Sequence, residues 1–475
     1  MTNTRIRISA LLLAISGLLT PHPAAFGAGK APKTHELTFS GKATPEQYYV
    51  PVYTSFTVPE GIVKISVTQH LGSGEARPGN LDLGIFDERG AGFEGPGFRG
   101  WSGGARRSFE IGETEATPGY LAGRINPGRW TVIQMPTTAG RTTDWTLKIT
   151  LTEGPRAKKL PAPSYAAPQL NDKPGWYRIA PHVHTVHSDG RLTPAEVIAL
   201  GKASGLDGIV STDHNTTSAL LHWGEVQDPE FLVINGMEVT YGQGHWNIFG
   251  LDPHAWIDFR IHHNDTLRYR KAVAKARKAG RLLVANHPYN LDFLYDVTPM
   301  DGIEVWNSAW SPANERAVEL WHTLLVGGNR KFAVASTDFH RGGNIASPHT
   351  VVRAEALSAE AVIDAIAAGR SYMARDTSVE IGMQVRNSAT PVQHADIGDT
   401  LLRSGGMQAA AGLRLTDQQG WFSDTSIAPG TVVVSIPERS LWVRAELRAE
   451  DGSMIALTNP IYIQHPLTTQ SLLPE

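Results

Sequence analysis

The sequence predicts an α/β fold in which a barrel of alternating strands and helices is flanked by an N-terminal and a C-terminal all-β sandwich domain. Three observations predict it. Short strand patterns separated by turn residues occupy both the N-terminal and the C-terminal part of the chain. A stretch without periodicity follows the N-terminal strand patterns. In the centre of the chain, strand and helix patterns alternate. A chain of 475 residues is also longer than one hydrophobic core usually supports, so several domains are expected.

The first residues have the layout of a secretory signal peptide. Arg5 and Arg7 precede an apolar run over residues 8–19, and small residues follow up to Ala28. The apolar run is shorter than the roughly 20 residues that span a bilayer, which favours cleavage over a membrane anchor. We therefore expect residues 1–28 to be a signal peptide and the mature protein to be exported, periplasmic or extracellular, without stable membrane insertion.

Residues 35–152 are predicted to form the N-terminal β-sandwich. Turn signals such as Asp87-Glu88-Arg89-Gly90 separate its short strand patterns. These patterns cover residues 63–68, 81–86, 130–134 and 145–151. Residues 153–176 are rich in Pro, Ala and Lys and show no periodicity, which predicts a linker.

Residues 177–376 are predicted to form the barrel, because strand patterns alternate there with helical ones. One helix start is well marked, since Thr193 can cap it, Pro194 takes the first position and Glu196 completes a capping box. The strand patterns cover residues 177–184, 207–212, 232–238, 245–250, 282–286, 302–305 and 331–336. Residues 377–470 return to a β pattern with a hairpin turn at Glu450-Asp451-Gly452, which predicts the C-terminal sandwich.

Composition excludes some functions and narrows the chemistry of others. With 43 basic and 46 acidic residues, the net charge of -3 provides no cationic surface for phosphate backbones, so no nucleic-acid partner is expected. The sequence contains no cysteine, so metal ligands and catalytic groups must come from His, Asp, Glu and hydroxyl side chains. Protein partners are not predicted.

Ionisable side chains follow almost every central strand pattern. In barrels of this kind the C-terminal ends of the strands form the active-site face. A lone His at a strand end is more often structural, and His187, His222, His254, His262, His263 and His322 are interpreted in that way. The set as a whole is costly to bury unless its members are paired or bind metal. Its members are His182, His184, Asp189, Asp213, His214, Glu238, His245, His287, Asp338 and His340.

The ordered motifs of the central region resemble those of the PHP superfamily (polymerase and histidinol phosphatase). They are Pro181-His182-Val183-His184-Thr185, Ser188-Asp189-Gly190, Thr212-Asp213-His214-Asn215, Gly236-Met237-Glu238-Val239, Asn286-His287-Pro288 and Thr337-Asp338-Phe339-His340. The spacing from Glu238 to His245, and the segment Leu457-Thr458-Asn459-Pro460-Ile461-Tyr462, are similar to the CehA/McbA branch, named for carbaryl hydrolases.

The resemblance implies a distorted seven-stranded (β/α) barrel that holds two or three divalent metal ions. It implies that Glu238 bridges a first and a second ion and that Asp338 takes part in catalysis. The implied ligands are His182, His184, Glu238 and Asp338 for the first ion, Glu238, His287 and His245 for the second, and Asp189, His214 and His340 for the third. The chain departs from many family members at Asn247, where they place a His.

The chemistry of this set fits a hydrolase. Mixed imidazole and carboxylate ligation suits Zn, Mn or Fe, and paired cations lower the pKa of a shared water, which predicts a metal-bound hydroxide as nucleophile. Asp213 is predicted to orient a ligand from outside the metal site. Every predicted ligand lies outside residues 37–151, so the metal site is expected to stay intact when that segment is removed.

Three functions stay open. The leading one is hydrolysis of a small-molecule phosphoester, in which Arg341 would hold an anionic group through its permanent charge. The first alternative is hydrolysis of a carboxylic or carbamate ester, as the CehA-like features suggest. The second alternative is a secreted binding protein whose barrel is inactive.

Overall fold

The computed structural model describes residues 32–72, 78–262, 264–289, 296–383, 400–402, 411–427, 430–432, 436–437 and 439–463. The predicted signal peptide and parts of the predicted C-terminal sandwich lie outside these residues, as does His263. In the described part of the chain, no helix has the length and apolar character that crossing a membrane requires.

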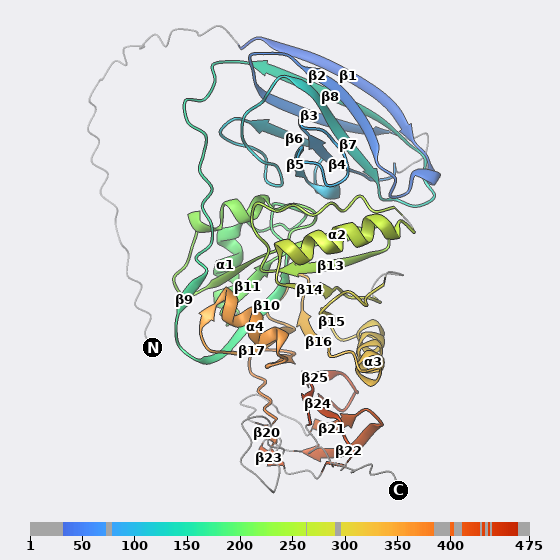
Figure 1. Cartoon of the computed structure of the whole chain (residues 1–475), viewed down its shortest axis with the longest axis vertical. Coiled ribbons are helices and arrows are strands. Elements are labelled where there is room, and N and C mark those ends of the chain that lie inside the picture. The colour runs from blue at the N-terminus through green and yellow to red at the C-terminus, as the bar shows by residue number, and fades with distance from the viewer. Residues whose placement is uncertain are drawn as a thin grey trace, which may run out of the picture.

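The N-terminal strands form two antiparallel sheets of four strands each, at the top of Figure 1. Residues from both sheets, including Ile65, Leu83, Trp130 and Leu147, share one buried core. One sheet has the order β1 (Thr34–Ala43), β8 (Thr143–Glu153), β3 (Ile62–Gly72), β6 (Ser108–Gly112). The other has the order β2 (Val52–Val58), β7 (Gly128–Pro136), β4 (Leu81–Phe86), β5 (Phe98–Trp101).

One large mixed sheet occupies the centre and continues toward the C-terminus. Its first half runs in the order β16 (Phe332–Ser336), β15 (Gly302–Asn307), β14 (Leu282–Ala285), β13 (Gly244–Phe249), β12 (Leu232–Tyr241), β11 (Gly208–Ser211) and β10 (Gly175–Val183). Its second half continues through β17 (His349–Ala354), β19 (Ser371–Ala374), β25 (Met454–Thr458), β24 (Trp442–Arg448), β21 (Ala411–Asp417) and β22 (Gly420–Ile427), and β26 (Ile461–Tyr462) pairs with β24.

The fold class predicted from the sequence, an α/β fold built on a (β/α) barrel, is wrong. The described residues are mostly β with four α-helices, and no helix-flanked barrel is seen among them. A tight turn after Tyr241 joins β12 directly to antiparallel β13, where a barrel of this type needs a helical crossover between parallel strands. Among the described residues of the C-terminal region, β25 pairs with β19 and so extends the central sheet.

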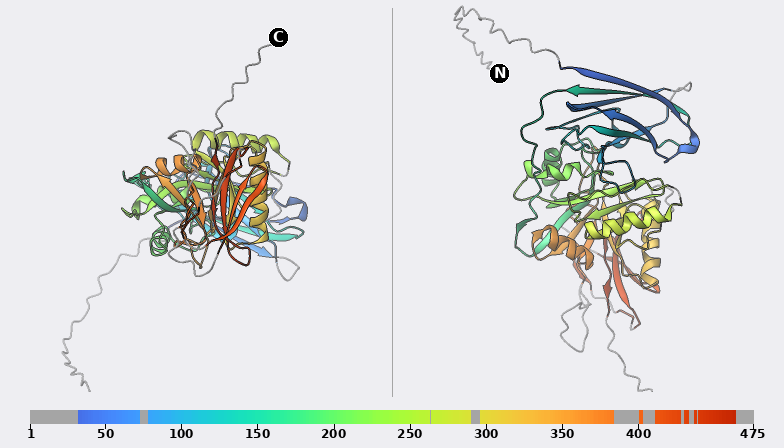
Figure 2. Two further views of the ribbon diagram at one scale, coloured as in Figure 1. Left: turned by 90° about the horizontal axis from the view of Figure 1, so that it is seen from below. Right: turned by 45° about the horizontal axis from the view of Figure 1, so that its top comes forward.

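Four helices lie against the central sheet in the middle of the molecule (Figures 1 and 2). The predicted capping box is confirmed at α1, where the Thr193 side chain accepts from the backbone amide of Glu196. The helices are α1 (Pro194–Ala203), α2 (Thr266–Ala279), α3 (Pro312–Val326) and α4 (Ala359–Ala367). Short 3-10 helices are η1 (Pro45–Gln47), η2 (Gly103–Ala105), η3 (Ser218–Leu221) and η4 (Trp223–Glu225).

Four further short strands pair outside the main sheets. β9 (Gln169–Asn171), within the predicted linker, pairs with β18 (Leu357–Ser358), and β20 (Thr400–Leu402) pairs with β23 (Gly430–Val432). The predicted hairpin around residues 450–452 is confirmed between β24 and β25, where Gly452 adopts a left-handed φ of 83° that favours glycine.

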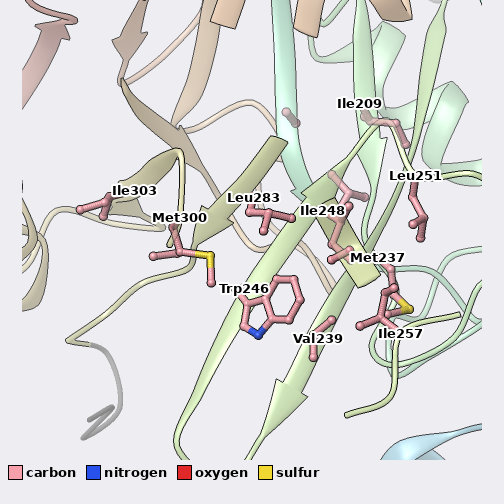
Figure 3. Packing of buried hydrophobic residues seen from close by; sticks show 14 of the residues in the cluster. Ile209, Met237, Val239, Trp246, Ile248, Leu251, Ile257, Leu283, Met300 and Ile303 are labelled. Atoms are coloured by element: carbon pink, nitrogen blue, oxygen red, sulfur yellow. The ribbon is translucent and has the colours of Figure 1, made fainter. Parts of the chain in front are cut away.

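The core behind the candidate site is built by strands β12, β13 and β14. Figure 3 shows Met237 and Val239 from β12 close to Trp246 and Ile248 from β13, and all four side chains are fully buried. Successive side chains of a strand point to opposite faces. Glu238 therefore points away from this apolar core.

Candidate metal centre

The ends of β10 and β16 bring the first histidines next to Asp338. Val183 and Phe339 form a parallel bridge, and the amide of His184 donates to the carbonyl of Phe339 at 2.9 Å. His182 and His184 are two residues apart, so they share a face of the extended chain. The same pairing places Asp338 and His340 beside them.

Strand register brings Glu238 and His245 to a common face. Glu238 pairs with Asn247 and Thr240 pairs with His245 in the antiparallel ladder of β12 and β13. Side chains at directly paired and alternate positions share a face, so Glu238 and His245 lie on the same side. An isolated parallel bridge between His214 and Glu238 adds the segment that follows β11.

Five imidazoles surround the carboxylate of Glu238, which is fully buried. Each of the five imidazoles has one ring nitrogen close to one of the two oxygens of Glu238. The distances are 3.3 Å from His182 Nε2, 3.4 Å from His184 Nε2, 2.6 Å from His214 Nδ1, 3.2 Å from His245 Nδ1 and 3.5 Å from His287 Nε2.

Among the described residues, the potential ligands divide into four groups, and His182, His184, His214 and Glu238 each belong to two of them. In each group one ligand atom per residue lies within 4.8 Å of the others. We name His182, His184, Glu238 and Asp338 the inner cluster, and His184, Asp189, His214 and His340 the outer cluster. A third group contains His214, Glu238 and His245, and a fourth contains His182, His287 and Glu304. Among the described residues, no such group joins His245 to His287, which the resemblance assigns to one ion.

The donor atoms of the inner cluster fit a metal ion. His182 Nε2, His184 Nε2, Glu238 Oε2 and Asp338 Oδ1 are buried, and none of them makes a hydrogen bond within the described residues. His184 Nε2 nevertheless lies 2.9 Å from Asp338 Oδ1. Buried polar atoms normally have partners, so atoms that converge without hydrogen bonds are suited to a shared cation.

The electrostatics of the cluster favour ionised carboxylates. Burial alone would raise the pKa of Glu238, but His214 and His182 outweigh it and hold that pKa well below its ordinary value. Burial likewise opposes ionisation of Asp338, and His182 is the main group that holds its pKa well below the usual range. Burial, followed by His340 and His214, lowers the pKa of His184 to about 3, which keeps this imidazole neutral and able to bind a cation.

Two residues of the candidate centre have unusual backbone conformations. Asp338 has a φ of 53° and His287 a φ of 26°, in the left-handed region that side chains other than glycine rarely adopt. Such conformations persist where the surrounding structure fixes them and are common at functional sites.

The two remaining predicted site residues are Asp213 and Arg341. Asp213 is buried and accepts from Thr185 N at 2.8 Å, Thr185 Oγ1 at 2.8 Å and Ser188 Oγ at 2.7 Å, so it braces the chain between His184 and Asp189. Arg341 follows His340 with an exposed side chain, and no ion pair joins it to another described residue.

Sequence reasoning missed residues that contact the predicted ligands, among them Glu304 and Asn286. Glu304 on β15 is buried, with Oε1 3.2 Å from His182 Nδ1, and Asn286 Nδ2 donates to Glu238 Oε1 at 2.7 Å. A signal for Glu304 was available, since a single carboxylate interrupts the apolar run of its strand and needs a buried partner. Asn286 directly precedes His287 in the motif Asn286-His287-Pro288, and the sequence alone gives no sign of its contact with Glu238.

Comparisons with known proteins find fold likenesses at low identity. No family model matches the chain, and no curated protein matches it. A two-domain protein from Bacteroides vulgatus, described as containing a predicted PHP-like metal-dependent phosphoesterase, is 17% identical with a TM-score of 0.36, covering 63% of this chain and 100% of its own.

Two further solved structures are similar over a smaller part of the chain. A putative metal-dependent phosphoesterase from Bifidobacterium adolescentis is 16% identical with a TM-score of 0.26, over 39% of this chain and 90% of its own. An amidohydrolase from Chromobacterium violaceum with bound sulfate is 18% identical with a TM-score of 0.28, over 35% of this chain and 89% of its own.

Proposed function

We propose that this protein is a metal-dependent hydrolase of the PHP type that acts on small-molecule phosphoesters. The observation that carries the proposal is the buried carboxylate of Glu238 surrounded by five imidazoles, with Asp338 beside them. Two or three bound cations are the simplest partners for so many carboxylates and imidazoles in a buried position.

The residues divide into ligands and groups that orient them. The inner cluster would hold one ion, Glu238 with His245 and His287 a second, and the outer cluster a third. Zn, Mn or Fe bound there would polarise the ester and lower the pKa of water in the site. Glu304 fixes the ring of His182, and Asn286 fixes one oxygen of Glu238.

The choice of a phosphoester is supported by charge. Several cations in one pocket favour an anionic substrate, and the exposed guanidinium of Arg341 lies next in sequence to the outer cluster. The CehA-like motif spacing makes a carboxylic or carbamate ester the competing substrate, and an inactive binding protein is a third outcome of the same test.

The test is a substrate panel on protein of known metal content. Purified protein is stripped with a chelator, reloaded with Zn²⁺, Mn²⁺ or Fe²⁺, and assayed with aryl phosphomonoesters, aryl phosphodiesters, aryl acetates and naphthyl carbamates. We expect metal-dependent turnover of a phosphoester that a His182→Ala variant loses. Turnover of acetate or carbamate alone would assign the alternative ester activity, and metal binding without any turnover would support a binding protein.

We also propose that the protein is exported. The support is the arrangement of Arg5, Arg7, the apolar run and the small residues before Ala28. N-terminal sequencing of protein recovered outside the cytoplasm of an expressing bacterium tests it. A mature N-terminus near Gly27 or Ala28 is expected, and an intact Met1 in the cytoplasmic fraction would contradict it.

A further inference from the structure

Asp189 reaches the outer cluster from a short loop, residues 184–190, that follows β10. Its Oδ1 lies 3.2 Å from His340 Nε2 and 3.6 Å from His214 Nε2. The loop turns back tightly on its own start, because a Cβ on Gly190 would lie 2.5 Å from the carbonyl of His184. The position of the Asp189 carboxylate therefore depends on what holds this loop.

The loop is held from two sides by opposite charges. On one side, the carboxylate of Asp213 accepts hydrogen bonds from Thr185 and Ser188. Arg106, which lies between η2 and β6 in the N-terminal part of the chain, donates to the carbonyls of Ser188 at 3.1 Å and Val186 at 2.5 Å. A planar guanidinium can serve two carbonyls at once, which a lysine ammonium matches poorly.

The N-terminal part of the chain contacts the same region at a second point, Gly119, in the connection between β6 and β7. Its carbonyl accepts from Thr216 Oγ1 at 2.9 Å, and its amide donates to Ser218 Oγ at 3.1 Å. Ser218 Oγ also lies 2.8 Å from Nδ1 of His187, inside the loop. Gly119 has a φ of 99°, and a Cβ there would lie 2.7 Å from the carbonyl of His187.

These contacts argue against the expectation that the metal site is independent of residues 37–151. Although the predicted ligands lie outside that range, the loop that presents one of them is hydrogen-bonded to Arg106. Without the guanidinium, two carbonyl oxygens lose their charged partner, and a flexible loop holds a ligand less accurately.

We propose that Arg106 is a positioning residue of the metal centre and that the N-terminal strands, through it, fix Asp189 for binding of an ion in the outer cluster. The inference rests on the proposed metal-binding function. It adds a dependence of metal loading on a residue about 80 positions before the loop.

Metal titration tests this without any substrate. Chelator-stripped wild type, Arg106→Met, Arg106→Lys and Asp189→Asn are titrated with Mn²⁺, with bound metal measured after gel filtration and folding checked by circular dichroism. Arg107→Met is the matched control, because Arg107 is the exposed neighbour of Arg106. We expect Arg106→Met to bind the most weakly held Mn²⁺ ion at least about tenfold less tightly than the wild type does. Arg106→Lys should recover part of the lost affinity, and Arg107→Met should bind Mn²⁺ like the wild type.

A double-mutant cycle separates positioning from general destabilisation. If Arg106 acts through Asp189, the variant Arg106→Met with Asp189→Asn should bind metal no worse than Asp189→Asn alone. Unchanged titration of Arg106→Met, or fully additive losses in the double variant, would overturn the inference. Should Arg106→Met not fold, the same cycle with Arg106→Lys decides. Wild-type protein that binds no Mn²⁺, Zn²⁺ or Fe²⁺ would instead overturn the proposed function itself.

Discussion

The carboxylate of Glu304 lies 3.2 Å from Nδ1 of His182, so the opposite ring nitrogen, Nε2, faces the inner cluster. That nitrogen lies 3.3 Å from Glu238 and 3.1 Å from Asp338. The other oxygen of Glu304 accepts from the backbone amide of His287 at 3.1 Å. One buried carboxylate thus fixes a ring and a chain segment of the candidate metal centre.

Glu304→Gln should weaken metal binding by about 10- to 100-fold while the protein stays folded, because a neutral amide holds the His182 ring less firmly than a carboxylate does. Isothermal titration with Mn²⁺ measures the change. Glu319→Gln, an exposed position on α3, is the control and should bind like the wild type. Equal affinities for the two variants would show that Glu304 has no orienting role.

Asp213→Asn should reduce the free energy of unfolding by about 1–3 kcal/mol, because Asn offers one acceptor oxygen to the three donors that Asp213 now serves. Urea denaturation in the presence of a chelator measures this without a contribution from metal. A midpoint equal to that of the wild type would remove Asp213 from its bracing role.

Arg341→Met should raise the KM for an anionic phosphoester by about tenfold and leave kcat nearly unchanged, since a charge that only holds the substrate contributes uniform binding. The same variant should not change the KM for a neutral aryl acetate. Equal KM values for wild type and variant on the phosphoester would assign Arg341 to the solvated surface.

The stability of the metal-free protein should depend on pH through Asp82 on β4. Burial chiefly raises its pKa from 3.8 to about 7, partly offset by the hydrogen bond from Thr137. Because the folded pKa lies above the unfolded one, this stabilisation is complete below about pH 4 and is lost as the pH rises through 7.

Asp82→Asn should remove that pH dependence. Its Tm should match the wild type near pH 4 and exceed it at pH 8, as measured by differential scanning calorimetry in a chelating buffer. A wild-type Tm that follows the variant at every pH between 4 and 8 would contradict the raised pKa.

Local patterns in the sequence predicted individual elements well. Thr193, Pro194 and Glu196 mark the start of α1, and Glu450-Asp451-Gly452 marks a hairpin, because caps and turns depend on neighbouring residues. The set of residues that gathers around Glu238 was also predicted, since potential ligands at strand ends form an ordered pattern along the chain.

Long-range pairing could not be read in the same way. The barrel prediction assumed that each central strand runs parallel to the next, whereas β12, β13 and β14 pair antiparallel. The pairing of β25 with β19 joins segments about 80 residues apart, which no local pattern encodes. The contact of Arg106 with Val186 was missed for the same reason.

Glu238→Gln tests the central claim most directly, with metal stoichiometry and turnover measured on the same folded sample. Glutamine keeps the shape of the side chain but offers one acceptor oxygen and no charge among the five surrounding imidazoles. The account predicts that at least one metal equivalent is lost and that turnover falls by orders of magnitude, while Glu319→Gln retains both. Near-normal metal content together with turnover within a few-fold of the wild type would contradict it.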